Sequence, residues 1–137
     1  MNFIVLVLLF LRPSTPESIQ GIWLSSDQEV KIRIYQKTDK KFYGQIIWFK
    51  ESPDNGKFPN DIKNPDPALR QRKIIGLEIL KDFYYDAPSQ KWKNGTIYHP
   101  QHGKTFRGLM WLQGQELQIR GYWGLLYRTN SWTKVVE

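Results

Sequence analysis

The sequence "EVKIRIY" (residues 29–35) has a period of two, and this period decides the fold class of the chain. Val30, Ile32 and Ile34 fall on one side of an extended segment, and charged or polar side chains fall on the other. This pattern is typical of a strand with one buried and one solvated face. The next apolar segment, "FYGQIIWFK" (residues 42–50), is apolar on both sides, which indicates a strand whose outer face is also covered.

Short segments of the same kind continue to the C-terminus, and "APSQ", "KNG", "HPQHG" and "QGQ" supply turn residues between them. They cover residues 73–80, 81–86, 95–99, 104–112, 115–123 and 127–136. The only predicted helix is a single turn from Pro67 to about Arg72. Strands at this spacing without long helices predict an all-β, antiparallel up-and-down barrel of about eight strands. A closed barrel of that size can just hold one small ligand.

Length and composition limit the function classes. The chain has 137 residues, which suits one domain, and its formal net charge is +7. A basic chain suits nucleic acid, anionic lipid or acidic small molecules, and the charge alone chooses none of them. The absence of cysteine excludes disulfides, thiolate metal sites and a cysteine nucleophile.

The N-terminus differs from the rest of the chain. "NFIVLVLLFL" (residues 2–11) is an unbroken apolar run, shorter than the roughly 20 residues of a spanning helix and close to a signal-peptide core. No Lys or Arg precedes it, and no small-residue cleavage site follows it. We expect residues 1–20 to be a signal or export segment, or else an apolar extension packed on the body. The barrel domain is expected over residues 21–137, with the mature protein periplasmic or secreted.

The predicted barrel begins with "GIW" (residues 21–23). In the lipocalin group, a Gly-x-Trp at the start of the first strand and a late arginine close the barrel, because the indole plugs one end and the guanidinium stacks on it. Gly21 and Trp23 match this pattern, with Arg128 as the expected partner and Arg120 as the second choice. A tryptophan buried in some other kind of core fits the same residues.

A larger resemblance covers nearly everything after Gln20. The chain resembles the bacterial exported family of domain of unknown function 2147, in the order and spacing of six motifs. They are the Gly-x-Trp start, G-x-I-x-W (residues 44–48), N-P-D-x-x-L-R-x-R-x-x-x-G (64–76), W-x-x-G-x-I-Y-x-P-x-x-G-K (92–104), L-x-x-R-G-Y (117–122) and R-T-x-x-W (128–132). The resemblance implies export and a lipocalin-like (calycin) barrel. It assigns no catalytic residues.

Catalytic and metal sites find little support. His99 and His102 stand where the family commonly has acids, but zinc needs three or four ligands and no third candidate is evident. Asp82 and Asp86 do not indicate a shared site, and there is no nucleophile elbow or glycine-rich phosphate loop. We therefore expect no enzyme activity, no metal and no cofactor.

The favoured function is the binding or transport of a small hydrophobic or amphipathic ligand, such as a fatty acid or lipid fragment, with its apolar part among aromatic side chains. The candidates are Ile46, Trp48, Tyr84, Phe106, Met110 and Tyr122. Basic residues at the mouth favour an acidic head group and allow contact with anionic envelope lipids. Two alternatives stay open: an envelope interaction protein with a filled barrel, and a basic barrel that stacks single-stranded nucleic acid on aromatics. Export disfavours nucleic acid as a partner. The oligomeric state is not predicted.

The stretch "NPDPALRQRKIIG" (residues 64–76) reads as a stiff lid. Asp66 is expected to cap the helical turn that Pro67 begins, and Leu69 to anchor it on the barrel. Arg70 and Arg72 cannot share one face of a helix. One of them is expected to brace the lid against a carboxylate, and Arg72 is the candidate contact for an acidic head group.

Overall fold

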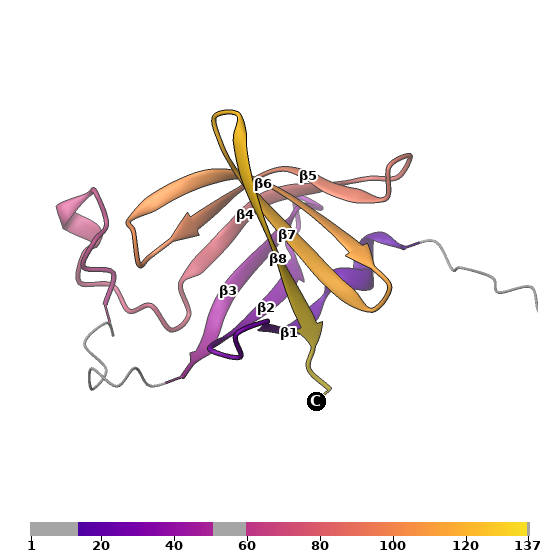
Figure 1. Ribbon diagram of the computed structural model, residues 1–137. Helices are drawn as coiled ribbons and strands as arrows, with labels where there is room; N and C mark the ends of the chain where they lie inside the picture. Colours follow the sequence, from indigo (N-terminus) through magenta and orange to yellow (C-terminus); the bar gives the residue numbers. More distant parts are fainter. Residues whose placement is uncertain (1–13, 51–59, 137) are drawn as a thin grey trace, which may run out of the picture.

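The computed structural model describes residues 14–50 and 60–136 (Figure 1). Its eight strands are antiparallel, each is hydrogen-bonded to the next, and the last pairs with the first to close a barrel. This confirms the expected up-and-down barrel. The strands are β1 (Gly21–Ser25), β2 (Val30–Gln36), β3 (Phe42–Phe49), β4 (Glu78–Asp86), β5 (Lys91–His99), β6 (Lys104–Gln113), β7 (Glu116–Trp123) and β8 (Leu126–Lys134).

Helical structure in the described residues is limited to two 3-10 turns, η1 (Pro16–Ile19) and η2 (Pro67–Leu69). None of the helices in these residues is long and apolar enough to cross a membrane. Of the two strands expected over residues 73–80 and 81–86, only residues 78–86 form a strand, the single β4, and Lys73 makes only an isolated bridge with Asn60. The predicted export segment falls mainly on residues 1–13, which lie outside the described residues.

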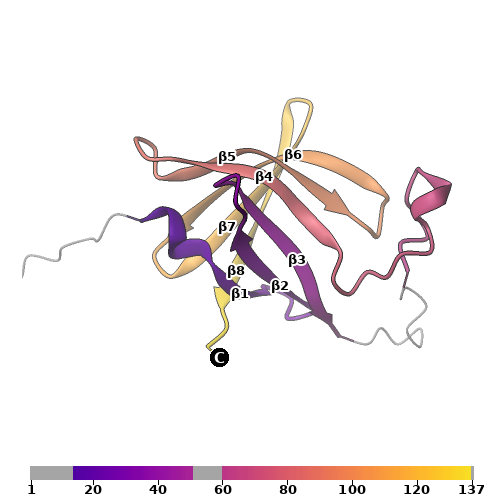
Figure 2. The same cartoon turned by 180° about the vertical axis from the view of Figure 1, so that it is seen from behind.

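The seam between β1 and β8 is short. Only Trp23 to Ser25 pair with Lys134 to Trp132, whereas β7 and β8 pair along their whole length. The part of β8 nearer Leu126 therefore has no β1 neighbour. The β7–β8 hairpin consequently projects beyond the other strands, as both views show (Figures 1 and 2).

The middle of the barrel is filled by side chains. Phe42, Phe83 and Trp92 are fully buried, and the rings of Phe42 and Trp92 meet edge to face with 6.3 Å between their centroids. The Phe83 ring lies where a Cβ atom of Gly95 would be, and a Cβ at Gly108 would come within 2.7 Å of it. These glycines let the ring rest directly on the backbone of β5 and β6.

Two of the four register shifts between neighbouring strands decide where Trp48 and Tyr84 point. Lys31 pairs with Trp48 while Ile32 pairs with Ile46, so Ile47 is an extra residue in β3. An extra residue reverses the alternation of the strand beyond it. Trp48 therefore lies on the outer face, with the Lys31 ammonium 4.9 Å from its ring centroid.

The shift that places Tyr84 is one of two in the pairing of β3 with β4. Phe42 pairs with Phe83 and Gly44 pairs with Leu80, which leaves one extra residue in β4 next to Asp82 (φ 63°). Phe83 is therefore buried, and Tyr84 is exposed on the outside.

Candidate functional site

One end of the barrel is closed by Trp23. Its ring is buried, its Nε1 donates a 2.8 Å hydrogen bond to the carbonyl of Ile19, and the Lys134 ammonium lies 4.8 Å from its centroid. Lys134 also donates to the carbonyl of Gln20. Gly21 has φ 122°, a conformation that residues with a side chain rarely adopt, and this favours glycine beside the Lys134 ammonium.

The expected partners of Trp23 were wrong. Lys134 stands opposite Trp23 in the β1–β8 register, and Arg128 is six residues away on β8, or about 20 Å at strand rise. The guanidinium of Arg120 stacks elsewhere, 4.1 Å from the ring centroid of Tyr127 and 4.8 Å from that of Trp111. A lysine performs the role that the pattern assigned to an arginine.

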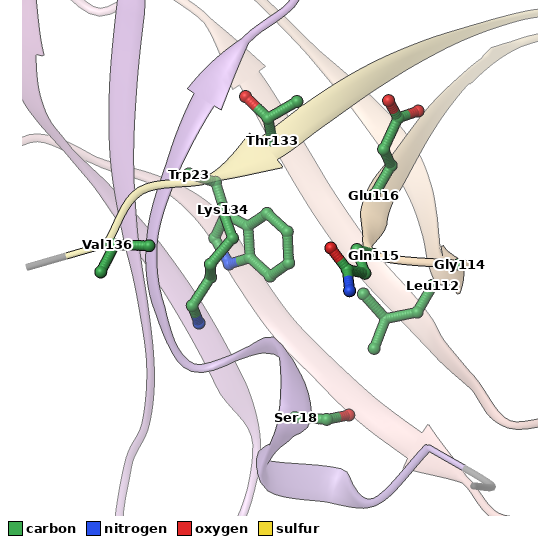
Figure 3. A pocket seen from close by; sticks show the side chains of 9 residues that line it. All are labelled: Ser18, Trp23, Leu112, Gly114, Gln115, Glu116, Thr133, Lys134 and Val136. Carbon is green, nitrogen blue, oxygen red and sulfur yellow. The ribbon is translucent and has the colours of Figure 1, made fainter. Parts of the chain in front are cut away.

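A pocket of about 630 Å³ lies beside this closed end, between η1 and the β6–β7 turn. Figure 3 shows Trp23 and Lys134 on one side of it and Leu112 and Gln115 on the other. It forms where β8 ends at Lys134. Beyond that residue, β8 no longer fills the space between the first residues of β1 and the first residues of β7. Its walls are the groups that close the barrel, so we assign it to closure.

The residues expected to line a ligand cavity are divided among three environments. Ile46 and Met110 face inward and are buried in the packed core. Trp48, Tyr84 and Tyr122 face outward, so placing them inside the barrel was wrong. Tyr122 lies opposite Arg107 in the β6–β7 register and lines a hollow of about 370 Å³ on the outer face.

Phe106 alone of the six is both inward-facing and partly accessible. It pairs with Ile97 and alternates with the buried Gly108 and Met110 along β6. It lies toward the end opposite Trp23, which we call the open end. The β1–β2, β3–β4, β5–β6 and β7–β8 connections meet at this end, because the strands alternate in direction.

The inner face of β8 is exposed near the open end. Trp132 opposite Leu117, Asn130 opposite Ile119 and Arg128 opposite Gly121 share one face, because directly paired residues point the same way. Nearer the closed end, Leu117 and Ile119 belong to the core, and Trp132 packs against it. Asn130 and Arg128 are exposed. These two side chains are thus accessible on the side of β8 that faces inward further along the strand.

The surface next to Arg128 is apolar, and at Gly121 no side chain rises above the backbone. Gly121 has no side chain, and a Cβ atom there would be 3.7 Å from Phe106 Cβ and 3.8 Å from Ile97 Cδ1, which is ordinary contact. Glycine within a strand often marks the close approach of another group to the backbone. Arg128 therefore stands at the edge of an apolar surface made by Ile97, Phe106 and the Gly121 backbone.

Two histidines lie at the same end. The rings of His99 and His102 stack with 4.7 Å between centroids, and His99 Nδ1 is buried without a hydrogen-bond partner. Burial lowers the pKa of His99, and the charges of His102 and Arg128 lower it further. Among the described residues, no three His, Asp or Glu side chains gather so as to hold a metal ion.

Comparison with known proteins places this barrel in a family. A family model described as "Uncharacterized protein conserved in bacteria (DUF2147)" matches residues 21–134. The chain belongs to the DUF2147 family. The match runs from the first residue of β1 to the last residue of β8, so the DUF2147 domain of this chain is the barrel.

A solved structure supports the fold of this DUF2147 protein. Protein HP1028 from Helicobacter pylori, described as belonging to the lipocalin family, aligns with a TM-score of 0.71 and 24% identity over 86% of this chain and 83% of that one. The barrel is therefore lipocalin-like. No curated protein matches the chain.

The DUF2147 motif at residues 64–76 forms a braced segment at the side of the barrel (Figure 1). Asp66 accepts a 3.0 Å hydrogen bond from the backbone of Ala68, which confirms the predicted cap. Leu69 is exposed and does not anchor the turn, contrary to expectation. Arg70 Nε donates to the carbonyl of Asn64 at 2.8 Å, so this arginine braces the segment itself.

The centre of the brace is Asp61, which the sequence interpretation missed. This buried carboxylate accepts hydrogen bonds from Tyr98 (2.5 Å), Asn64 (2.8 Å) and Arg72 Nε (2.9 Å). A second Arg72 nitrogen lies 2.9 Å from the same carboxylate. The guanidinium proposed to meet a ligand is thus engaged in bracing. Burial raises the pKa of Asp61, but the three donors outweigh it and the net pKa is lowered.

Proposed function

We propose that this protein binds a small amphipathic molecule with an acidic group at the open end of its lipocalin-like barrel. The observation that carries the proposal is the exposure of Arg128 and Asn130 on the face that forms the core further along β8. Because Arg128 is exposed, its guanidinium is available to a ligand as a charged partner. A carboxylate supplies the opposite charge.

The surface around Arg128 matches both the apolar part and the acidic group of such a molecule. Ile97 and Phe106 supply apolar contact beside Gly121, and Arg128 can bind a carboxylate through two parallel hydrogen bonds. A fatty acid or lipid fragment has this combination of a chain and an acidic end. The middle of the barrel is filled at the level of Phe83, so the ligand would lie near the mouth rather than deep inside.

The filled middle also supports a second candidate function. Phe42, Phe83 and Trp92 occupy the space that a deep ligand would need. An interaction protein of the cell envelope with no small ligand has the same interior. Arg128 binds the acidic group of a ligand in the first candidate function and meets no small ligand in the second. A binding measurement therefore separates the two.

The test uses an environment-sensitive hydrophobic probe displaced by a long-chain fatty acid and by the alcohol of equal length. We expect one probe per chain, displaced by both. Arg128→Ala should weaken the acid by roughly tenfold or more and leave the alcohol unchanged, because only the acid uses the charge. Arg107→Ala removes the same charge from the outer face and is the matched control. Equal loss of acid and alcohol, or no probe binding at all, favours the filled-barrel alternative.

We also propose that the mature protein lies outside the cytoplasm. The apolar run at residues 2–11 supports this, because its length suits a signal-peptide core. Mass spectrometry of soluble protein from its native host should find a chain that lacks this run. An intact N-terminus on that material would contradict export by cleavage.

A further inference from the structure

We propose that the tip of the β7–β8 hairpin, residues 123–127, inserts shallowly into an anionic lipid surface. The tip exposes four large apolar or aromatic side chains in five residues: Trp123 is 68% exposed, Leu125 101%, Leu126 70% and Tyr127 61%. Scattered exposed apolar residues are normal, but a contiguous group indicates an interaction site.

The exposed leucine at the turn has no role in the fold. Trp123 pairs with Leu126, so Gly124 and Leu125 form a two-residue turn, and Gly124 (φ 59°) supplies the backbone that such turns need. Turn positions of this kind usually carry small polar residues. Leu125 buries nothing, so it does not stabilise the barrel. The two strands of the hairpin are paired up to Trp123 and Leu126, directly beside the turn.

Cations surround the base of the tip on both faces. The Lys104 ammonium is 5.1 Å from the Trp123 ring centroid, and the Arg120 guanidinium is 4.1 Å from the ring centroid of Tyr127. Arg107 is opposite Tyr122 in the register, two residues behind Gly124, or about 7 Å at strand rise. Shallow interfacial segments reach about 5–10 Å into a bilayer, so the cations would meet the phosphates when the tip is inserted.

Charge selects a lipid surface as the partner. Residues 117–136 contain no Asp or Glu, and residues 87–137 hold seven Lys and Arg against two Asp and Glu. Most of the formal charge of +7 is therefore on the C-terminal part of the chain, which carries the hairpin. Basic residues near a membrane are attracted to anionic lipid, and tryptophan and tyrosine favour the interface. A hairpin tip of leucine and aromatic side chains, with cationic side chains just behind it, fits an anionic lipid surface.

The experiment measures partition of the purified chain onto vesicles by sedimentation. Vesicles of phosphatidylcholine alone are compared with vesicles that also contain phosphatidylglycerol. We expect binding to the anionic vesicles that weakens with salt, and a loss of about tenfold or more in the double variant Leu125→Ser with Leu126→Ser. Ile75→Ser makes the same kind of change at an exposed position away from the hairpin and should bind as wild type. Melting temperatures of all variants should be alike, because these side chains are exposed.

Insertion itself is read from a fluorophore, which is practical because the chain has no cysteine. An environment-sensitive dye on Leu125→Cys should shift to the blue with anionic vesicles, and the same dye on Gln115→Cys, at the opposite end of the barrel, should not. Equal shifts at both positions, or wild-type partition of the double leucine variant, would overturn the proposal. So would tip-dependent self-association, or capture of a protein by the tip, without vesicle binding. The ligand proposal is separate, since Arg128→Ala tests ligand affinity and the leucine variants test only partition.

Discussion

The ammonium of Lys134 lies over the ring of Trp23, 4.8 Å from its centroid, and the two residues stand opposite each other where the first and last strands meet. This pair joins the ends of a barrel whose β1–β8 seam is only three residue pairs long. Beyond these pairs, Val135 donates a 2.9 Å backbone hydrogen bond to the Ile22 carbonyl, and no further strand pairing joins β1 to β8 in the described residues. The cation–ring contact therefore acts at the point where the barrel opens most easily.

Removing that cation should weaken the fold. We expect Lys134→Ala to lower the free energy of unfolding by about 1 kcal/mol, since it loses the ring contact and the hydrogen bond to the Gln20 carbonyl. Arg128→Ala should change it by less than about 0.5 kcal/mol, because Arg128 is exposed and remote from Trp23. Urea unfolding measures both. A larger loss of unfolding free energy in Arg128→Ala than in Lys134→Ala would mean that Arg128, rather than Lys134, closes the barrel.

Alanine substitutions at Gly95, which contacts Phe83, and at Gly121 should differ more strongly in their cost to stability. A Cβ atom at Gly95 would overlap the Phe83 ring, which is fully buried and cannot move aside without disturbing the core. Gly95→Ala should cost about 2–3 kcal/mol of unfolding free energy through overpacking. Gly121→Ala is the matched control on the same inner face, where the nearest side-chain atoms are at contact distance, and it should cost less than 1 kcal/mol. Thermal unfolding of the two variants side by side decides the point.

The sequence predicted the architecture because short extended segments, some with a clear period of two, alternate with turn residues along the chain. It did not reveal the bulges at Ile47 and next to Asp82, since an extra residue is set by pairing with the neighbouring strand. Trp48 and Tyr84 were consequently placed on the wrong face. Tyr122 is a different case: Leu117 and Ile119 are apolar at alternate positions of β7, so the pattern itself put Tyr122 outside.

The brace at Asp61 was out of reach for another reason. Its partners Asn64, Arg72 and Tyr98 lie up to 37 residues away, and no local pattern marks a carboxylate that is buried by contacts so remote in sequence. The stretch of residues 64–76 was recognised as a stiff, charge-braced segment. Its attachment to the barrel near the open end depends on the register that brings Tyr98 of β5 to Asp61.

Breaking the brace at its centre should be costly. Asp61→Asn keeps the size of the side chain but removes the charge that Arg72 and two other donors share. We expect a loss of about 2–3 kcal/mol, since a paired charge left without its partner destabilises strongly and Arg72 is only partly exposed. Asp66→Ala, which removes only the cap of η2, should cost about 1 kcal/mol. Equal losses in the two variants would mean that the brace contributes no more than the cap.

The last prediction follows from the lowered pKa of Asp61. A carboxyl whose pKa is lower in the folded chain than the unfolded value of about 3.9 stabilises the fold fully above that value, and the contribution is lost as the pH falls through the folded pKa. Wild type should therefore exceed Asp61→Asn in stability most at pH 7, and the gap should narrow toward pH 3. Burial and the bond to Asp61 raise the pKa of Tyr98 to about 12, so the phenol stays a donor throughout this range. Tyr98→Phe removes that donor while keeping Arg72, and should reduce the pH dependence only in part. Urea unfolding of the three proteins at several pH values measures the gap, and a gap that widens on acidification would show that Asp61 is protonated in the folded chain.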